Sequence, residues 1–173
     1  MMLKIAKEND AAQIALLVNS AYRGESSRQG WTTEADLLGG QRTDPDAILK
    51  ILRTPDNIFL LCFLDGVLTG SVHLRREQKN CYLGMFVIKP QNQAQGLGKA
   101  FLMHAETFAR ETWQCATMMM TVIALRTELM QWYERRGYVN TGKRVDFPYG
   151  DEQFGIPYRD DLQLSVLQKV FTA

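Results

Sequence analysis

The sequence has few of the residues that mark specialised classes of protein. Its 173 residues include 3 cysteines, 5 prolines and 2 histidines. The cysteines, Cys62, Cys81 and Cys115, are far apart, form no CxxC pair and have no neighbouring histidine. Neither a disulfide framework nor a structural zinc site is therefore indicated. Free cysteine is among the most buried residue types, so we expect three buried thiols in a reducing compartment.

The sequence also has no large excess of positive or negative charge and no long apolar run. The 20 Lys and Arg residues nearly balance the 19 Asp and Glu residues, which argues against a general nucleic-acid-binding protein. The longest purely apolar run, Ile58–Leu64, is far shorter than the ~18 residues of a membrane span. The first charged residue, Lys4, comes too early in the chain for the apolar stretch of a signal peptide to be expected. We therefore expect a cytoplasmic protein with no nucleic-acid or membrane partner.

The sequence does contain the mixture of short strands and helices typical of one α/β domain over residues 1–173. We expect a mixed, mostly antiparallel central sheet with helices on both faces. Two segments, 23–43 and 144–161, follow neither periodicity, and a loop as long as the first is either disordered or functional. Apolar spacing predicts helices near 10–21, 44–52, 100–109 and 129–136, and strands near 3–6, 58–64, 67–74, 82–88, 117–124 and 162–170.

A glycine-containing turn joins the strand near 82–88 to the helix near 100–109. Gly96 and Gly98 in this turn would let a phosphate approach the unpaired N–H groups at the helix start, with Lys99 nearby. Two common phosphate motifs do not fit. Gln93 occupies the place of the first P-loop glycine, and Phe101 that of the third small residue of a dinucleotide fingerprint. The turn predicts a site for another phosphate-containing ligand, with an ordinary tight turn as the alternative.

Two segments carry a family resemblance. Residues 93–98 (QAQGLG) resemble the Gln/Arg-x-x-Gly-x-Gly/Ala signature of the GNAT N-acetyltransferase superfamily, and residues 132–138 (WYERRGY) resemble a helix end common in it. The resemblance implies the GNAT fold and acetyl-coenzyme A as cosubstrate, without a metal. It also implies acetyl transfer to a primary amine of a small molecule or peptide, by direct attack in a ternary complex. A non-catalytic acyl-coenzyme A sensor on the same fold is the alternative.

The same resemblance implies roles for individual residues. Tyr133 takes the place of the general acid that protonates the departing thiolate, although a core-facing position explains it too. Backbone groups of Phe86 and Val87 would pair with the pantetheine arm. Arg126 stands where the family often has Asn, and is available to meet a phosphate. The amides expected to hold the pyrophosphate belong to Gln95, Gly96, Leu97, Gly98, Lys99 and Ala100.

Attack by an amine on a thioester also needs a proton acceptor, either a carboxylate or an ordered water. The candidates lie in segment 23–43 and are Glu25, Glu34 and Asp36. We rank Glu25 first, because Arg23 and Arg28 flank it. A solvated loop acid is the alternative for each of them.

The acceptor itself is indicated only by residue types. Arg23, Arg28 and Arg42 lie in or beside segment 23–43, and arginine binds carboxylates bidentately. They predict an amine that also carries an acidic group, with plain solubility of the loop as the alternative. Aromatic residues of segment 144–161, together with Trp31, are expected to surround the acceptor or to pack the loop onto the body. The oligomeric state stays open, with a homodimer as one option.

Overall fold

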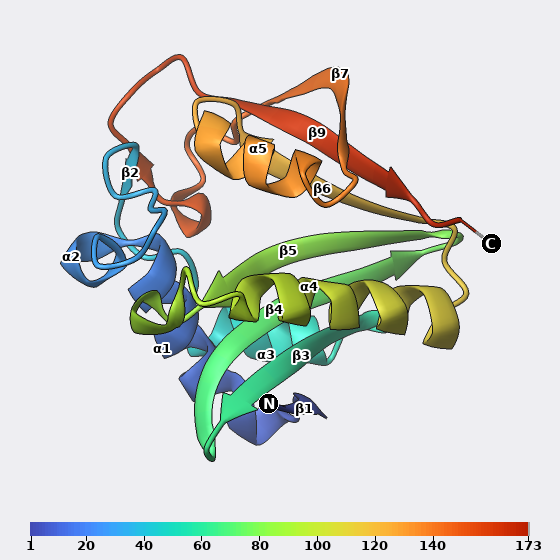
Figure 1. Ribbon diagram of the computed structural model, residues 1–173. Coiled ribbons are helices and arrows are strands. Elements are labelled where there is room, and N and C mark those ends of the chain that lie inside the picture. The colour runs from blue at the N-terminus through green and yellow to red at the C-terminus, as the bar shows by residue number, and fades with distance from the viewer. Residues whose placement is uncertain (173) are drawn as a thin grey trace.

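The computed structural model describes residues 1–172 and contains one seven-stranded sheet in the order β1-β3-β4-β5-β6-β9-β7 (Figure 1). Within these residues, β5 and β6 form a parallel pair and the other neighbours are antiparallel. The strands are β1 (Met2–Ile5), β3 (Asn57–Leu64), β4 (Val67–Glu77), β5 (Asn80–Ile88), β6 (Thr117–Ile123), β7 (Val139–Asp146) and β9 (Gln163–Val170). The predicted mixed, mostly antiparallel sheet is confirmed.

Helices cover both faces of this sheet, as predicted (Figure 1). One face carries α1 (Ala11–Tyr22) and α3 (Pro45–Leu52), which share an apolar core with inward residues of β3 and β5. The other face carries α4 (Leu97–Thr107) and α5 (Thr127–Glu134), packed over the second core. The three cysteines are free and buried, as expected.

The sheet opens between its two parallel strands. The register of β5 and β6 pairs only residues 80–82 with 117–119, and the strands separate beyond Tyr82 (Figure 1). A bulge follows in β5, where Met85 and Phe86 lie opposite the single residue Val72 of β4. Met85 adopts a φ of 43° there. Such bulges bend a strand and re-aim its side chains, so the bulge shapes the edge of β5 at the opening.

One strand of the sheet was not expected from the sequence. All residues of β7 are exposed, and its sequence VNTGKRVD has no apolar alternation, because it pairs only with β9 at the edge of the sheet.

The two irregular segments are also joined. β2 (Leu38–Gly39) of segment 23–43 pairs with β8 (Ile156–Pro157) of segment 144–161, and α2 (Gly24–Ser27) lies in the first segment.

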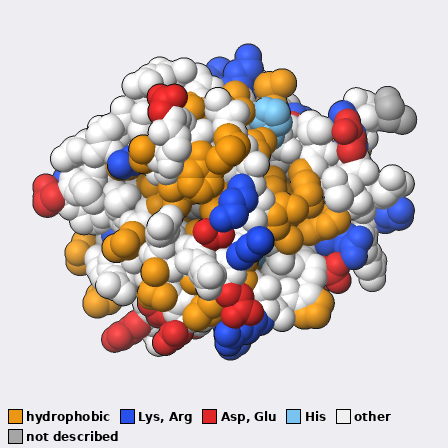
Figure 2. Space-filling view, turned by 90° about the horizontal axis from the view of Figure 1, so that it is seen from below, with side chains coloured by type: hydrophobic (Ala, Val, Ile, Leu, Met, Phe, Trp, Pro, Cys, Tyr) orange, Lys and Arg blue, Asp and Glu red, His pale blue; other side chains and the backbone are white. Residues whose placement is uncertain are grey.

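The surface agrees with the balanced composition. On the face shown in Figure 2, acidic and basic side chains lie among separate hydrophobic patches. Within residues 1–172, no helix has the length and apolar character needed to cross a membrane.

Candidate active site

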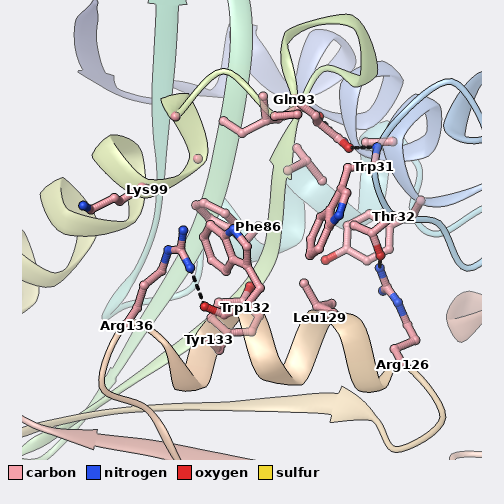
Figure 3. A pocket seen from close by; sticks show the side chains of 17 residues that line it. Trp31, Thr32, Phe86, Gln93, Lys99, Arg126, Leu129, Trp132, Tyr133 and Arg136 are labelled. Atoms are coloured by element: carbon pink, nitrogen blue, oxygen red, sulfur yellow. Dashed lines mark hydrogen bonds between the residues drawn. The ribbon is translucent and has the colours of Figure 1, made fainter.

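Two cavities lie where β5 and β6 separate. The first has a volume of about 260 Å³ and extends along α5 to the start of α4 (Figure 3). The second, of about 170 Å³, lies towards the irregular segments 23–43 and 144–161. The two cavities share five lining residues: Tyr22, Phe86, Arg126, Leu129 and Tyr133. The opening in the sheet is therefore lined from both sides by the same small group of residues.

The first cavity ends at the glycine turn. Gly96, with a φ of 80°, caps α4, a conformation that glycine adopts without strain. In the part of the chain that the structure describes, the N–H groups of residues 94–99 donate to no protein acceptor. The N–H of Ala100 donates to the oxygen of Gly96, so its expected part in anion binding is not supported. Free amides at a helix start are the kind of donors that bind anionic groups in proteins.

Besides Arg126, two basic side chains line the same cavity. Lys99 lies in the first turn of α4, and Arg136 follows α5 (Figure 3). The guanidinium carbon of Arg136 lies 3.5 Å from the centroid of the Trp132 ring, and its Nη1 donates to the Trp132 oxygen. Its buried Nε has no acceptor among residues 1–172. Arg136 was not predicted from the sequence, although it lies three residues after Tyr133 in the second motif segment.

Gln93 of the first motif segment has a structural role. Its Nε2 donates to the Ile88 oxygen at the end of β5 (2.9 Å), and its Oε1 accepts from the N–H of Trp31 (2.7 Å; Figure 3). A Cβ built on Gly30 would lie 2.5 Å from this Oε1, so glycine makes the approach possible. Gln93 thereby holds Trp31 at the first cavity. Trp31 was expected at the acceptor and lines only this cavity.

Tyr133 lies at the junction of the two cavities and is 4% exposed. Its ring packs edge-on against Trp132 and Tyr138, with centroid distances of 5.0 and 5.5 Å. Burial raises the pKa of Tyr133 above its ordinary value, with a further contribution from nearby Tyr22, so the phenol stays protonated at neutral pH. Within residues 1–172, the hydroxyls of Tyr22 and Tyr133 have no hydrogen-bond partner, whereas that of Tyr138 donates to Glu106. Tyr22, which packs on the core beneath α1, was not predicted from the sequence as a site residue.

A buried ionic cluster holds segment 23–43 against α5. Glu34 accepts from Nη2 of Arg23 (3.1 Å) and from Nη1 of Arg126 (2.9 Å), and all three side chains are less than 10% exposed. The other terminal nitrogen of Arg126 donates to the Thr32 hydroxyl (2.7 Å). Burial lowers the pKa of Arg23, and the charge of Arg42 lowers it further, while Glu34 opposes both.

The cluster contains Arg126 and Glu34, for which the sequence suggested functional roles. Figure 3 shows Arg126 at the opposite end of the first cavity from Lys99, already bonded to Thr32. This geometry does not favour the expected phosphate contact. Glu34 lines the second cavity, but both of its oxygens are paired with arginine, so the geometry does not favour it as the general base.

Glu25 and Asp36 lie outside both cavities. The side chain of Glu25 is 92% exposed and that of Asp36 is 72% exposed, and both pair with Arg28. The geometry therefore does not favour Glu25 as the general base. Glu25 was ranked first for its flanking arginines, of which Arg23 turns inward and Arg28 stays at the surface.

The second cavity receives residues from both irregular segments. Segment 144–161 contributes Phe147, Pro148 and Phe154, whereas Tyr149 and Tyr158 are 44% and 64% exposed and do not line it. Nη2 of Arg23 donates to the oxygen of Phe154 (3.0 Å), which fixes one segment to the other. Of the aromatic residues expected to surround the acceptor, Phe147 and Phe154 thus line the second cavity, whereas Tyr149 and Tyr158 do not.

The opening in the mixed sheet thus has a cavity with free helix amides on one side and a second cavity on the other. Residues 21–138 match the sequence profile described as the acetyltransferase (GNAT) family, which is more than half of the chain. The chain belongs to this family, as the resemblance predicted, and acetyl transfer is the family's activity. No curated protein matches the sequence.

Solved structures support the fold. A GNAT-family acetyltransferase from Streptococcus pneumoniae is 20% identical, with a TM-score of 0.69 and coverage of 98% of this chain and 99% of that one. The ribosomal-protein-alanine N-acetyltransferase from Brucella melitensis is 15% identical, with a TM-score of 0.70 and coverage of 99% and 100%. The yncA structure from Salmonella typhimurium, with its cofactor acetyl-CoA, is 18% identical, with a TM-score of 0.70 and coverage of 100% and 95%.

Proposed function

We propose that the protein transfers the acetyl group of acetyl-coenzyme A to a primary amine of a small molecule. The observation that carries this proposal is the meeting of the two cavities at Tyr133. Acetyl-coenzyme A would occupy the first cavity and the amine would enter from the second. The nitrogen and the thioester would then meet in one ternary complex, with no covalent enzyme intermediate.

The free amides supply the anchor for the cosubstrate. The pyrophosphate would accept hydrogen bonds from residues 94–99, with Lys99 and Arg136 adding positive charge. The pantetheine arm would follow the first cavity under Trp31 towards the unpaired edge of β5. Backbone groups of Phe86 and Val87 on this edge would orient the thioester and stabilise charge that develops on its oxygen.

The reaction then needs two proton movements. The neutral amine attacks the carbonyl carbon, a C–N bond forms, and the C–S bond of the tetrahedral intermediate breaks. The departing thiolate takes the phenol proton of Tyr133, which is later replaced from solvent. The proton lost by the amine passes to water, since the one carboxylate that lines the second cavity, Glu34, is held by two arginines.

The site assignment predicts that bulk at Gly98 blocks acetyl-coenzyme A. A Cβ built on Gly98 lies 3.5 Å from the Trp132 ring and 3.7 Å from Ile88, both of which line the first cavity. A larger side chain would extend into the space beside the free amides. We expect Gly98→Trp to weaken binding at least tenfold in isothermal titration calorimetry, which corresponds to about 1.4 kcal/mol.

The matched control places the same indole elsewhere on the same helix. Met103 of α4 is 56% exposed and lines neither cavity, so Met103→Trp should leave the affinity unchanged. Thermal melting of both variants reports whether they are folded. Wild-type affinity in a folded Gly98→Trp protein would contradict the assignment of this cavity to the cosubstrate.

A further inference from the structure

Arg42 is a half-buried cation that lines the second cavity and is absent from the first. Within residues 1–172, its guanidinium forms no salt bridge and no hydrogen bond. Its central carbon lies 5.8 Å from the ring centroids of both Tyr22 and Phe154. Two aromatic rings thus flank a guanidinium whose five donors have no protein acceptor.

The backbone of this residue is held firmly. The side chain of Asn19 in α1 accepts from the N–H groups of Arg42 (2.8 Å) and Thr43 (3.1 Å). Its amide nitrogen donates to the Thr43 oxygen (2.9 Å). Three hydrogen bonds to α1 fix the point from which the Arg42 side chain extends, and such preorganisation favours recognition of a ligand of defined shape.

The charges around the second cavity do not balance. Three arginines (Arg23, Arg42 and Arg126) and one carboxylate (Glu34) line it, which leaves an excess of two positive charges. Glu34 is bonded to both of the other arginines, so Arg42 is the arginine of the three that has no acidic partner. A protonated amine alone would be repelled here, whereas a molecule that also carries an anionic group would be attracted.

The rest of the lining is mainly apolar. The side chains that form it include Leu38, Leu83, Met120, Val122, Phe147 and Leu164. The volume of about 170 Å³ is small for a ligand pocket and suits a metabolite better than a folded partner. We infer that the acceptor is a small amino acid with an apolar side chain, and that Arg42 binds its carboxylate as a bidentate pair. This inference rests on the proposed acetylation of an amine.

The structure also separates Arg42 from the other two arginines that the sequence suggested for this role. Arg23 is buried and engaged with Glu34 and with the oxygen of Phe154. Arg28 pairs with Glu25 and Asp36 outside the cavity. Arg28 is therefore a natural control, because it belongs to the same segment and carries the same charge.

The experiment measures binding separately from turnover. Enzyme saturated with coenzyme A is titrated in a calorimeter with leucine, methionine and phenylalanine, each compared with its primary amide. We expect the acid of at least one pair to bind at least tenfold more tightly than its amide. The amine of each amide is less basic than the amine of the corresponding acid, so a larger fraction of the amide is the reactive free base. A preference for the acid therefore cannot come from amine ionisation.

Two substitutions assign the preference to the arginine. Arg42→Gln should reduce the acid-over-amide ratio about tenfold, and Arg42→Lys should restore only part of it, because lysine keeps the charge but lacks the fork. Arg28→Gln should leave the ratio unchanged. Melting temperatures verify that all three variants are folded.

The outcomes separate the two hypotheses. Equal binding of acid and amide in every pair, no binding of any acid, or an acid preference that survives Arg42→Gln would overturn the inference. If acids bind through Arg42 but acetyl-coenzyme A yields no acetylated product, the carboxylate site stands and the proposed function fails.

Discussion

Replacing Tyr133 by phenylalanine is expected to lower turnover about a hundredfold or more while the affinity for acetyl-coenzyme A stays similar. The variant keeps the ring that packs against Trp132 and Tyr138 and removes only the hydroxyl of a residue that lines both cavities. Because burial raises the pKa of Tyr133, the phenol should remain protonated to above pH 10. No loss of activity on the alkaline side up to that pH is therefore expected from this residue.

Tyr22 provides a demanding control, because it lines both cavities and its pKa is also raised by burial. We expect Tyr22→Phe to keep turnover within about tenfold of the wild type. The measurement is release of free thiol under conditions where the chemical step limits the rate. A large loss in Tyr22→Phe with near-normal Tyr133→Phe would exchange the roles of the two tyrosines.

The cosubstrate side of the site could be predicted from the sequence because its information is local. Free amides follow from a helix start, and Gly96 and Gly98 mark a turn that keeps them accessible. The same locality explains why the strands and helices with apolar periodicity were found. The edge strand β7 was missed for the complementary reason, since a strand exposed along its whole length has no apolar alternation.

The acceptor side could be predicted only as a set of residue types. Three arginines in one segment suggested a carboxylate site, but their neighbours in sequence do not reveal which one faces a cavity. Contacts across long separations decide this: Arg23 meets Glu34 and the carbonyl of Phe154, and Arg42 is held by Asn19. Glu25 was favoured because arginines flank it in sequence, and the fold then left it in solvent.

Loss of the Glu34 carboxylate is expected to destabilise the whole protein. In Glu34→Ala the guanidiniums of Arg23 and Arg126 would stay buried without their anionic partner. Removing one member of a buried ion pair costs about 3–5 kcal/mol, since the remaining charge has lost both its water and its partner. We expect the free energy of unfolding to fall by this amount, measured as a lower midpoint of urea denaturation with the m-value nearly unchanged.

Asp36→Ala is the matched comparison, because Asp36 lies two residues away and also pairs with an arginine, but its side chain is 72% exposed. An exposed pair contributes about 0–1 kcal/mol, so this variant should unfold close to the wild type. Glu34→Gln keeps one acceptor oxygen and should fall between the two. The cluster joins segment 23–43, which contains Trp31 and Arg42, to the start of α5. Partial loosening of the segment in Glu34→Gln should therefore weaken acetyl-coenzyme A and acceptor together. Equal stability of Glu34→Ala and Asp36→Ala would show that the buried cluster does not hold the segment in place.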